Sequence, residues 1–307
     1  FLLLYSDNFV PFPIEKVLAL HNKNDFAVTF MISQKSPGNI SLDETGTVQK
    51  YDSNRSVELE YVEIGYMIVE KERTLQFFES PECSFSSILR KMAIQKQICA
   101  WIQQDAYHSI SDPERWEKTK AYLKPKKILL IDRDGVINQK APKGEYISHW
   151  EEFEWIPETL DAMKQLAQKG FRFIVISNQA GIARGMIEKN ELERIHQNMK
   201  AKLKKDGIEI LDIYVCPHSW DEGCSCRKPN PGMLFHLSKD HLLRLDKSLF
   251  IGDDPRDCQA AERAGTKSVY IGEDKDLQGL LCEELPIVSS TALLDIVNLI
   301  SNMDCYK

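Results

Sequence analysis

Acidic and hydroxyl side chains follow several apolar runs in the second half of the chain. They are Asp132 and Asp134 after KKILLI, Ser177 after FRFIVI, and Asp253 after SLFIG. If these runs are parallel strands, their carboxyl ends meet at one rim of a sheet, where ligands bind. Clustered carboxylates repel one another and favour a hard cation such as Mg²⁺. Lys228, in the segment CRKP, adds a fixed cation, and the set predicts a site for a phosphoryl group.

The alternative for the two acidic segments is ordinary turn chemistry. Asp and Gly favour turns, so either DRDG or GDD alone fits a loop without function. Both segments occur in register with a serine at a strand end and with a lysine further along the chain. That combination favours a site.

Three of the eight cysteines form a second cluster with one histidine. The four residues are Cys216, His218, Cys224 and Cys226. Three thiolates and an imidazole fill a tetrahedral Zn²⁺ site and leave no position for water, which is typical of a structural zinc. The cluster ends two residues before Lys228, so zinc there would fix that lysine. The alternatives are reduced thiols beside a surface histidine, or a redox CxC pair.

Apolar strands and amphipathic helices alternate from Ile128 onward. The predicted strands are KKILLIDRD, FRFIVISNQ, EILDIYVCP, SLFIGDD and TKSVYIG, and predicted helices cover Pro157–Lys169 and Glu188–Lys205. Continuous apolar strands with helices between them predict an α/β fold with a doubly wound parallel sheet. The interval from Asp132 to Ser177 has room for a helix and a loop but not for a cap domain. We therefore expect an open site.

The first 123 residues have a different pattern. Predicted strands are Asp25–Gln34 and Leu59–Glu70, and predicted helices are Phe85–Lys96 and a segment from Asp112 to Leu123. The segment KPKK at 124–127 predicts a short linker. We expect two domains, residues 1–123 and 124–307, with the zinc loop 216–226 in the second.

Charge and apolar content limit the partners. The chain has 307 residues and a formal net charge of −7, which argues against a nucleic-acid partner. No run approaches the ~20 apolar residues that span a bilayer. The opening FLLLYSDNF lacks the basic and apolar regions of a signal peptide. We expect a cytoplasmic protein with no membrane partner, and, since the first residue is Phe1, part of something longer.

The acidic motifs resemble those of the haloacid dehalogenase (HAD) phosphohydrolase superfamily. The matching segments are DRDGV at 132–136, Ser177, Lys228 and GDDPRD at 252–257. The resemblance implies a Rossmann-like sheet without a large cap domain. It implies that Asp132 attacks phosphorus, and that Asp134 protonates the leaving alcohol and then deprotonates water. Ser177 and Lys228 would neutralise the phosphoryl oxygens. Mg²⁺ would bind Asp132, the Asp134 carbonyl and Asp253.

Zinc ligands beside these motifs are typical of one HAD branch, the heptose 1,7-bisphosphate 7-phosphatases and the histidinol-phosphate phosphatases. SNQAGIARG at 177–185 and CRKPNPGM at 226–233 resemble the heptose enzymes. The short spacing from His218 to Cys224 resembles the histidinol enzymes, and Asp254 stands where heptose phosphatases often have Lys. The longer motifs favour D-glycero-D-manno-heptose 1,7-bisphosphate as substrate, with histidinol phosphate as the alternative. Candidate substrate contacts are Gly144, Tyr146, Asn178, Gln179, Arg184 and Arg227.

Residues 1–123 resemble part of a sugar-1-phosphate nucleotidyltransferase. The segments are LLLYSDNF, with Asp7 as the metal-binding acid, VEIGYMIVEK, which contains Glu63, and SISDPER at 109–115. The Gly-rich nucleotide-binding half of that family does not precede Asp7. We therefore expect weak nucleotide binding and a role in packing or dimerisation. The pairing implies neighbouring steps towards a nucleotide-activated heptose. The alternative is an assembly or regulatory module with an inert HAD domain, against which the complete acidic motifs argue.

Overall fold

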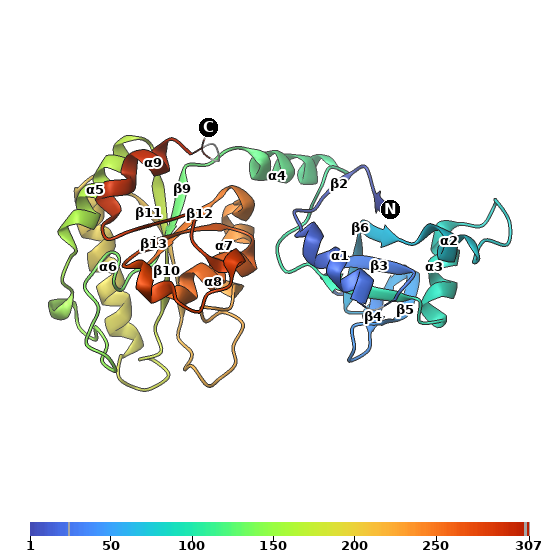
Figure 1. The fold of residues 1–307 in the computed structure, drawn as a ribbon, viewed down its shortest axis with the longest axis horizontal. Helices are drawn as coiled ribbons and strands as arrows, with labels where there is room; N and C mark the ends of the chain where they lie inside the picture. Colours follow the sequence, from blue (N-terminus) through green and yellow to red (C-terminus); the bar gives the residue numbers. More distant parts are fainter. Residues whose placement is uncertain (24, 304–305, 307) are drawn as a thin grey trace. The chain divides into compact units, whose positions relative to one another are not determined.

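The computed structural model describes residues 1–23, 25–303 and 306, and the chain divides into two compact units, 1–121 and 122–307 (Figure 1). The boundary between the units falls inside helix α4 (Pro113–Leu123), whereas the sequence pattern predicted a domain boundary after residue 123. Among the described residues, none of the helices has both the length and the apolar character that crossing a bilayer requires.

The first unit is built on a mixed six-stranded sheet in the order β5-β4-β6-β3-β7, with β1 also paired to β6. Strands β3 and β7 are parallel, and the other pairs are antiparallel. The bounds are β1 (Leu2–Leu4), β3 (Val28–Gln34), β4 (Gly38–Leu42), β5 (Val48–Ser56), β6 (Tyr61–Val69) and β7 (Ile98–Ile102). A separate two-stranded ribbon pairs β2 (Asn8–Phe9) with β8 (His108–Ser109).

The helices of the first unit are α1 (Ile14–Lys23), α2 (Lys71–Leu75), α3 (Phe85–Ile94) and the helix α4 given above. The apolar face of α3 packs on the sheet, because Ile88, Leu89 and Met92 share one buried cluster with the inward side chains of β3. The predicted strands at 25–34 and 59–70 are confirmed as β3 and β6. The predicted helices are confirmed as α3 and α4, with α3 ending two residues earlier than expected.

The second unit contains a six-stranded sheet that is parallel throughout, in the order β11-β10-β9-β12-β13-β14. The bounds are β9 (Ile128–Ile131), β10 (Arg172–Asn178), β11 (Ile210–Cys216), β12 (Leu249–Gly252), β13 (Lys267–Ile271) and β14 (Val288–Ser290). All five predicted strands are confirmed, as is the doubly wound parallel fold. Residues 132–171 hold loops, one 3₁₀ turn and one helix, and no cap domain.

Helices cover both faces of this sheet (Figure 1). They are α5 (Pro157–Gln168), α6 (Lys189–Lys205), α7 (Gly232–His241), α8 (Pro255–Ala264) and α9 (Val297–Ser301), with 3₁₀ turns at Trp150–Glu152, Leu245–Lys247, Asp274–Leu277, Cys282–Glu284 and Leu293–Ile296. Alternate residues of β9 show the two faces. Leu129 and Ile131 share a core with α5, α6 and α9, whereas Ile128 and Leu130 pack with α7 and α8.

The strand order fixes where a ligand site can form. Counted along the chain, the order is 3-2-1-4-5-6, which reverses direction between β9 and β12. Connections leave these two strands on opposite faces of the sheet, so a crevice opens beyond their carboxyl ends. Asp132 follows β9 and Asp253 follows β12. The fold therefore brings the two predicted acidic motifs to the switch point of the sheet.

Candidate active site

Three carboxylates meet at this switch point. Asp132 and Asp253 follow the central strands, and Asp257 lies in the first turn of α8. One oxygen of each lies within 4.8 Å of the others. Asp257 was part of the GDDPRD segment but was not singled out from the sequence. Its signal was the D-x-x-D spacing of a capping box with Asp254 at a helix start.

Two glycines make this approach of carboxylates possible. A Cβ on Gly135 would lie 1.9 Å from Oδ2 of Asp253, and a Cβ on Gly252 would lie 2.3 Å from Oδ2 of Asp257. Gly135 also has φ +91°, a conformation that other residues rarely adopt. The glycines of both acidic motifs are therefore needed for space at the carboxylates.

A buried lysine neutralises part of this negative charge. Nζ of Lys228 lies 2.9 Å from Oδ2 of Asp132 and 2.7 Å from Oδ1 of Asp257, and it donates to the carbonyl of Ile176 at 3.1 Å. These three contacts use the three donors of an ammonium group. Although burial opposes the charged form, Asp132 and Asp257 raise the pKa of Lys228. Lys228 is thus a fixed cation beside the predicted nucleophile.

Burial is the main electrostatic cost at the acids. It raises the pKa of Asp132, and repulsion from Asp257 and Asp253 adds to the rise, while Lys228 opposes it. Burial likewise raises the pKa of Asp253 to about 6, although Lys140 opposes this rise. Carboxylates with raised pKa values in a cleft mark a place where a bound cation would stabilise the ionised forms.

The donor set fits Mg²⁺. Oδ1 of Asp253 is buried and has no hydrogen-bond partner among the described residues. The Oδ2 atom of the same carboxylate lies 2.6 Å from Nζ of Lys140. One oxygen is therefore committed to a lysine and the other is left for a further cation, which suits a hard ion with oxygen ligands. Lys140 was not predicted, because it lies in a loop without a pattern that points to Asp253.

Asp134 points to a different set of partners. Nε and Nη2 of Arg133 donate to its Oδ1 at 3.1 and 2.8 Å, Asn138 donates to Oδ1 at 3.0 Å, and Gln179 donates to Oδ2 at 2.7 Å. Burial favours the neutral acid, but the charge and hydrogen bonds of Arg133, together with the two amides, lower the pKa of Asp134. These contacts favour the ionised form of Asp134. Its carboxylate is not part of the three-acid cluster.

Residues at the carboxyl end of β10 connect Asp134 to Lys228. The Ser177 hydroxyl accepts from Nε2 of Gln179 at 2.7 Å and lies 3.5 Å from Oδ2 of Asp134. The Asn178 amide accepts from the Lys228 N–H and donates to the Lys228 carbonyl, both at 3.1 Å. In this structure Asn178 and Gln179 therefore hold neighbouring site residues, and their contact with substrate stays a prediction.

The remaining candidate contacts lie on loops. Nη1 of Arg184 donates to the Tyr146 hydroxyl at 3.1 Å, so these two predicted residues are brought together. A Cβ on Gly144 would meet nothing within 4 Å. Arg227 donates to the His218 carbonyl at 3.3 Å, which joins it to the cysteine cluster. Their roles in substrate binding stay predictions.

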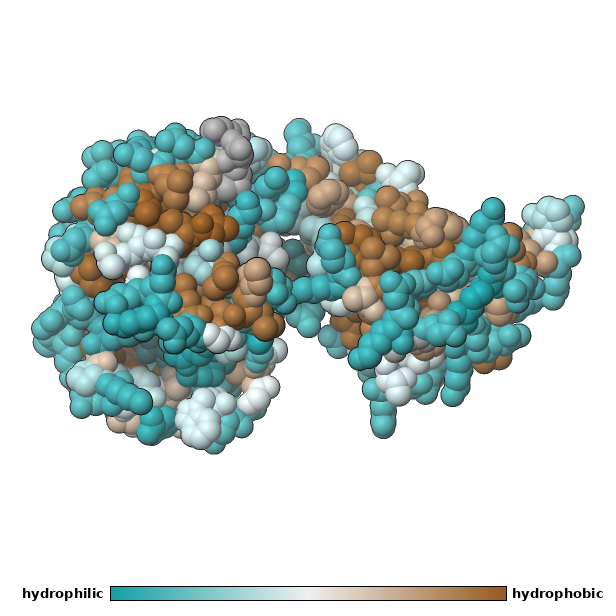
Figure 2. Space-filling model, viewed as in Figure 1, coloured by the Kyte–Doolittle hydropathy of each residue, from teal (hydrophilic) through white to brown (hydrophobic). Residues whose placement is uncertain are grey.

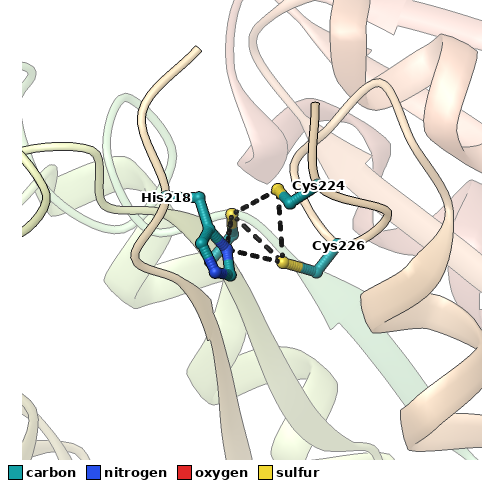
Figure 3. A group of neighbouring side chains, drawn as sticks. His218, Cys224 and Cys226 are labelled. Carbon is teal, nitrogen blue, oxygen red and sulfur yellow. Dashed lines mark hydrogen bonds between the residues drawn. The ribbon is translucent and has the colours of Figure 1, made fainter. Parts of the chain in front are cut away.

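The four predicted zinc ligands are brought together (Figure 3). The sulfurs of Cys216, Cys224 and Cys226 lie 3.3 to 3.6 Å apart, and Nδ1 of His218 lies 3.2 Å from Sγ of Cys226. Zn–S bonds of about 2.3 Å in a tetrahedron place sulfurs about 3.8 Å apart, close to these spacings. A disulfide needs sulfurs about 2.05 Å apart and does not fit.

We expect Gly135→Ala to separate crowding at Asp253 from backbone strain. The new Cβ would collide with Oδ2 of Asp253, so the variant should lose activity and melt at a lower temperature. Gly279→Ala is the control, since its φ of +97° is equally strained but its Cβ would meet nothing within 4 Å. Strain alone costs ~1–3 kcal/mol. Equal melting temperatures and full activity in both variants would contradict the assignment.

Fold, motif order and acid cluster together define a phosphatase domain of the HAD superfamily. The family model of the polynucleotide kinase 3 phosphatases matches residues 127–275. The D-glycero-beta-D-manno-heptose-1,7-bisphosphate 7-phosphatase of Pseudomonas putida is 40% identical over 149 residues, which are 48% of this chain and 84% of that protein. The D-glycero-alpha-D-manno-heptose-1,7-bisphosphate 7-phosphatase of Photorhabdus laumondii is 35% identical over 152 residues, 47% of this chain and 81% of that protein.

A solved structure of a heptose bisphosphate phosphatase is also similar to this chain. The crystal structure of a D,D-heptose 1,7-bisphosphate phosphatase from B. bronchiseptica, complexed with magnesium and phosphate, has 32% sequence identity and a TM-score of 0.52. The match covers 57% of this chain and 97% of that one. The chain belongs to the D-glycero-D-manno-heptose-1,7-bisphosphate 7-phosphatase family. Since the family model lies within the second unit, the nucleotidyltransferase resemblance of residues 1–123 stays a prediction.

Proposed function

We propose that the chain hydrolyses the 7-phosphate of D-glycero-D-manno-heptose 1,7-bisphosphate through an aspartyl-phosphate on Asp132. One observation carries the chemical part of the proposal. The Asp132 carboxylate lies at the switch point of the sheet, and a buried ammonium is held 2.9 Å from its Oδ2. Lys228 favours the ionised carboxylate, which is the nucleophilic form. The presence of Asp132, Asp134, Asp253 and Lys228 together argues against an inert HAD domain.

The first step transfers the phosphoryl group to Asp132. An oxygen of Asp132 forms a bond to phosphorus as the bond from phosphorus to the leaving sugar oxygen breaks. Asp134 gives that oxygen a proton, so it must take up a proton from solvent before this step. Lys228 stays beside Asp132 and offsets the charge that collects there.

The second step returns Asp132 to its starting state. Ionised Asp134 accepts a proton from water, whose oxygen attacks phosphorus and releases inorganic phosphate from Asp132. The hydrogen bonds of Asn138 and Gln179 orient the Asp134 carboxylate for both transfers. Asp132, the Asp134 carbonyl and Asp253 would hold Mg²⁺, which neutralises charge on the transferring phosphoryl group.

The choice of substrate rests on the similarity to the heptose enzymes and on the loops. Arg184 is paired with Tyr146, and Arg227 lies beside the cysteine cluster and next to Lys228 in the sequence. These two arginines would supply cations for the sugar hydroxyls or the second phosphate. The relatives named above act on different anomers, so both anomers belong in the test.

We expect the heptose 1,7-bisphosphate to give a higher kcat/KM than histidinol phosphate. A site that hydrogen-bonds several sugar hydroxyls loses those contacts with histidinol phosphate, which costs ~10²-fold or more. Phosphate release from the two heptose anomers, histidinol phosphate and a generic monoester measures this. A higher kcat/KM for histidinol phosphate would replace the heptose assignment with the alternative, and no release from any of them would favour the inert domain.

We also propose that the four-residue cysteine cluster binds structural zinc and fixes Lys228. Several contacts connect the cluster to that lysine. The Asn230 side chain donates to the Cys224 carbonyl at 2.7 Å, and the Gln179 N–H donates to the Cys216 carbonyl at 2.8 Å. Cys226 is two residues from Lys228. A loop closed by zinc would therefore restrain the chain at Cys226 and Asn230, two residues before and two residues after the lysine.

Cys224→Ser is expected to lose zinc, lower kcat ~10²-fold and lower the melting temperature, because a displaced cation at Asp132 weakens transition-state stabilisation. Mg²⁺ should still bind at Asp132 and Asp253, which the substitution does not touch. Cys282→Ser, at an exposed cysteine outside the cluster, is the control. Metal analysis of the purified chain should give one zinc. Full activity without zinc would show that the cysteines are only reduced thiols.

For the first unit we propose a packing or dimerisation role on a nucleotidyltransferase-like fold. The segments that carry the resemblance lie together, since the backbone carbonyl of Asp7 accepts from the Ile110 N–H at 2.8 Å and β1 pairs with β6. Figure 2 shows apolar side chains on the surface of this unit, and Phe1 and Leu4 are among the exposed ones. Light scattering tests the role: a mass of two chains supports dimerisation, and a mass of one chain contradicts it.

A further inference from the structure

A buried polar group behind Asp134 has no part in the proposed reaction. The Arg133 side chain is 1% exposed. Two of its nitrogens donate to Asp134, and its Nη1 lies 3.2 Å from Nε2 of His196. His196 belongs to α6, 63 residues further along the chain. Arg133 thus bridges an acid of the site and a histidine of a covering helix.

The chemistry of the two groups fixes the direction of this hydrogen bond. A guanidinium has five N–H donors and no acceptor, so Nη1 of Arg133 must donate. Nε2 of His196 must therefore accept, and the neutral ring carries its proton on Nδ1. Burial and the positive charge of Arg133 lower the pKa of His196 to about 3, which agrees with a neutral ring.

We propose that His196 is a positioning residue for Asp134. By accepting from Nη1, His196 fixes the plane of the Arg133 guanidinium, and the guanidinium then fixes the carboxylate that transfers protons. The role of Asp134 rests on the proposed function, whereas the hydrogen-bonded chain is independent of the substrate.

The surroundings allow this role to be separated from packing. The neighbours of His196 on the inner face of α6, Ile195 and Met199, are fully buried and anchor the helix to the core. His196 itself is only partly buried. Changing His196 should therefore leave α6 in place, while Arg133 loses the acceptor at Nη1.

Of three substitutions, two place an acceptor at different points and the third removes it. His196→Gln puts an amide oxygen at about the distance of Nε2, His196→Asn puts the same group one methylene nearer the backbone, and His196→Leu has no acceptor. We expect His196→Gln to stay within ~3-fold of the wild-type kcat. His196→Asn and His196→Leu should lower kcat ~10- to 30-fold with little change in KM, because a misplaced proton donor slows the chemical steps.

The measurements are kcat and KM with a simple phosphate monoester and melting temperatures for all four proteins. The positioning role is supported if His196→Gln keeps kcat and His196→Asn does not. The melting temperatures of the variants must not follow the same order as their kcat values. Wild-type kcat in His196→Leu, an equal loss in His196→Gln and His196→Leu, or a loss confined to KM would overturn it. A wild-type protein that is inactive on every monoester would instead overturn the proposed function.

Discussion

Asp132→Asn should lower the rate of phosphate release by ~10⁴-fold or more, as removal of other catalytic nucleophiles does. The amide has nearly the same shape but no negative charge, so it cannot form the bond to phosphorus. The fold should persist, because the residue still follows β9 and its backbone N–H still donates to the Ile251 carbonyl. Circular dichroism and phosphate release measure the two effects.

Asp254→Asn is the matched control for this substitution. Asp254 adjoins the acid cluster, but it caps α8 and pairs with Arg256 at 2.7 Å. Although burial opposes ionisation, Arg256 lowers the pKa of Asp254 to about 2. Asn also caps helices, so activity should stay within ~3-fold of wild type. Phosphate release by Asp132→Asn at a tenth of the normal rate would remove Asp132 from the nucleophilic role.

Lys228→Met should reduce both activity and stability. Methionine fills a similar volume but leaves Asp132 and Asp257 buried without their cation. Breaking a buried ion pair costs about 3–5 kcal/mol, and for a unit of this size that lowers the melting temperature by about 10 °C. Activity should fall ~10³-fold, since a preorganised charge at the reacting group is lost.

The stability deficit of Lys228→Met should depend on pH. Without the ammonium, burial holds the pKa of the Asp132 carboxyl above its value in the unfolded chain. Ionisation of Asp132 then destabilises the fold as pH rises, so the deficit should be smaller at about pH 5 than at about pH 8. Lys140→Met is the control, because Lys140 pairs with Asp253 but is about half exposed. A Lys228→Met variant as stable as Lys140→Met at both pH values would contradict the assigned role.

Local pattern was sufficient to predict five of the six strands of the second unit, because β9, β10 and β12 are largely buried and read as continuous apolar runs. Strand β14 has three partly buried residues and was not predicted. Local pattern was weaker in the first unit. Strand β5, VQKYDSNRS, lies at the edge of the sheet and alternates few apolar residues, and β4 has five residues. Their pairing depends on neighbours distant in sequence, so no strand was predicted there.

The residues of the candidate site also divide into those that the sequence pattern predicted and those that only the fold revealed. Asp132, Ser177, Lys228 and Asp253 follow strands or a motif, so their convergence followed from the order of a parallel sheet. Lys140 and His196 have no such signal. A lysine in a loop and a histidine on a helix acquire their partners only when the chain is folded. Contact of Asn178 and Gln179 with substrate stays a prediction, and the fold shows in addition which site residues they hold.

The most direct test is a phosphorus NMR time course of the Mg²⁺-supplemented protein with D-glycero-D-manno-heptose 1,7-bisphosphate. The two phosphates of this substrate give separate signals, so the spectrum shows which ester bond breaks. The account predicts that the 7-phosphate signal disappears as inorganic phosphate appears in equal amount, while the 1-phosphate signal persists. Loss of the 1-phosphate first, or no change in either signal, would contradict it.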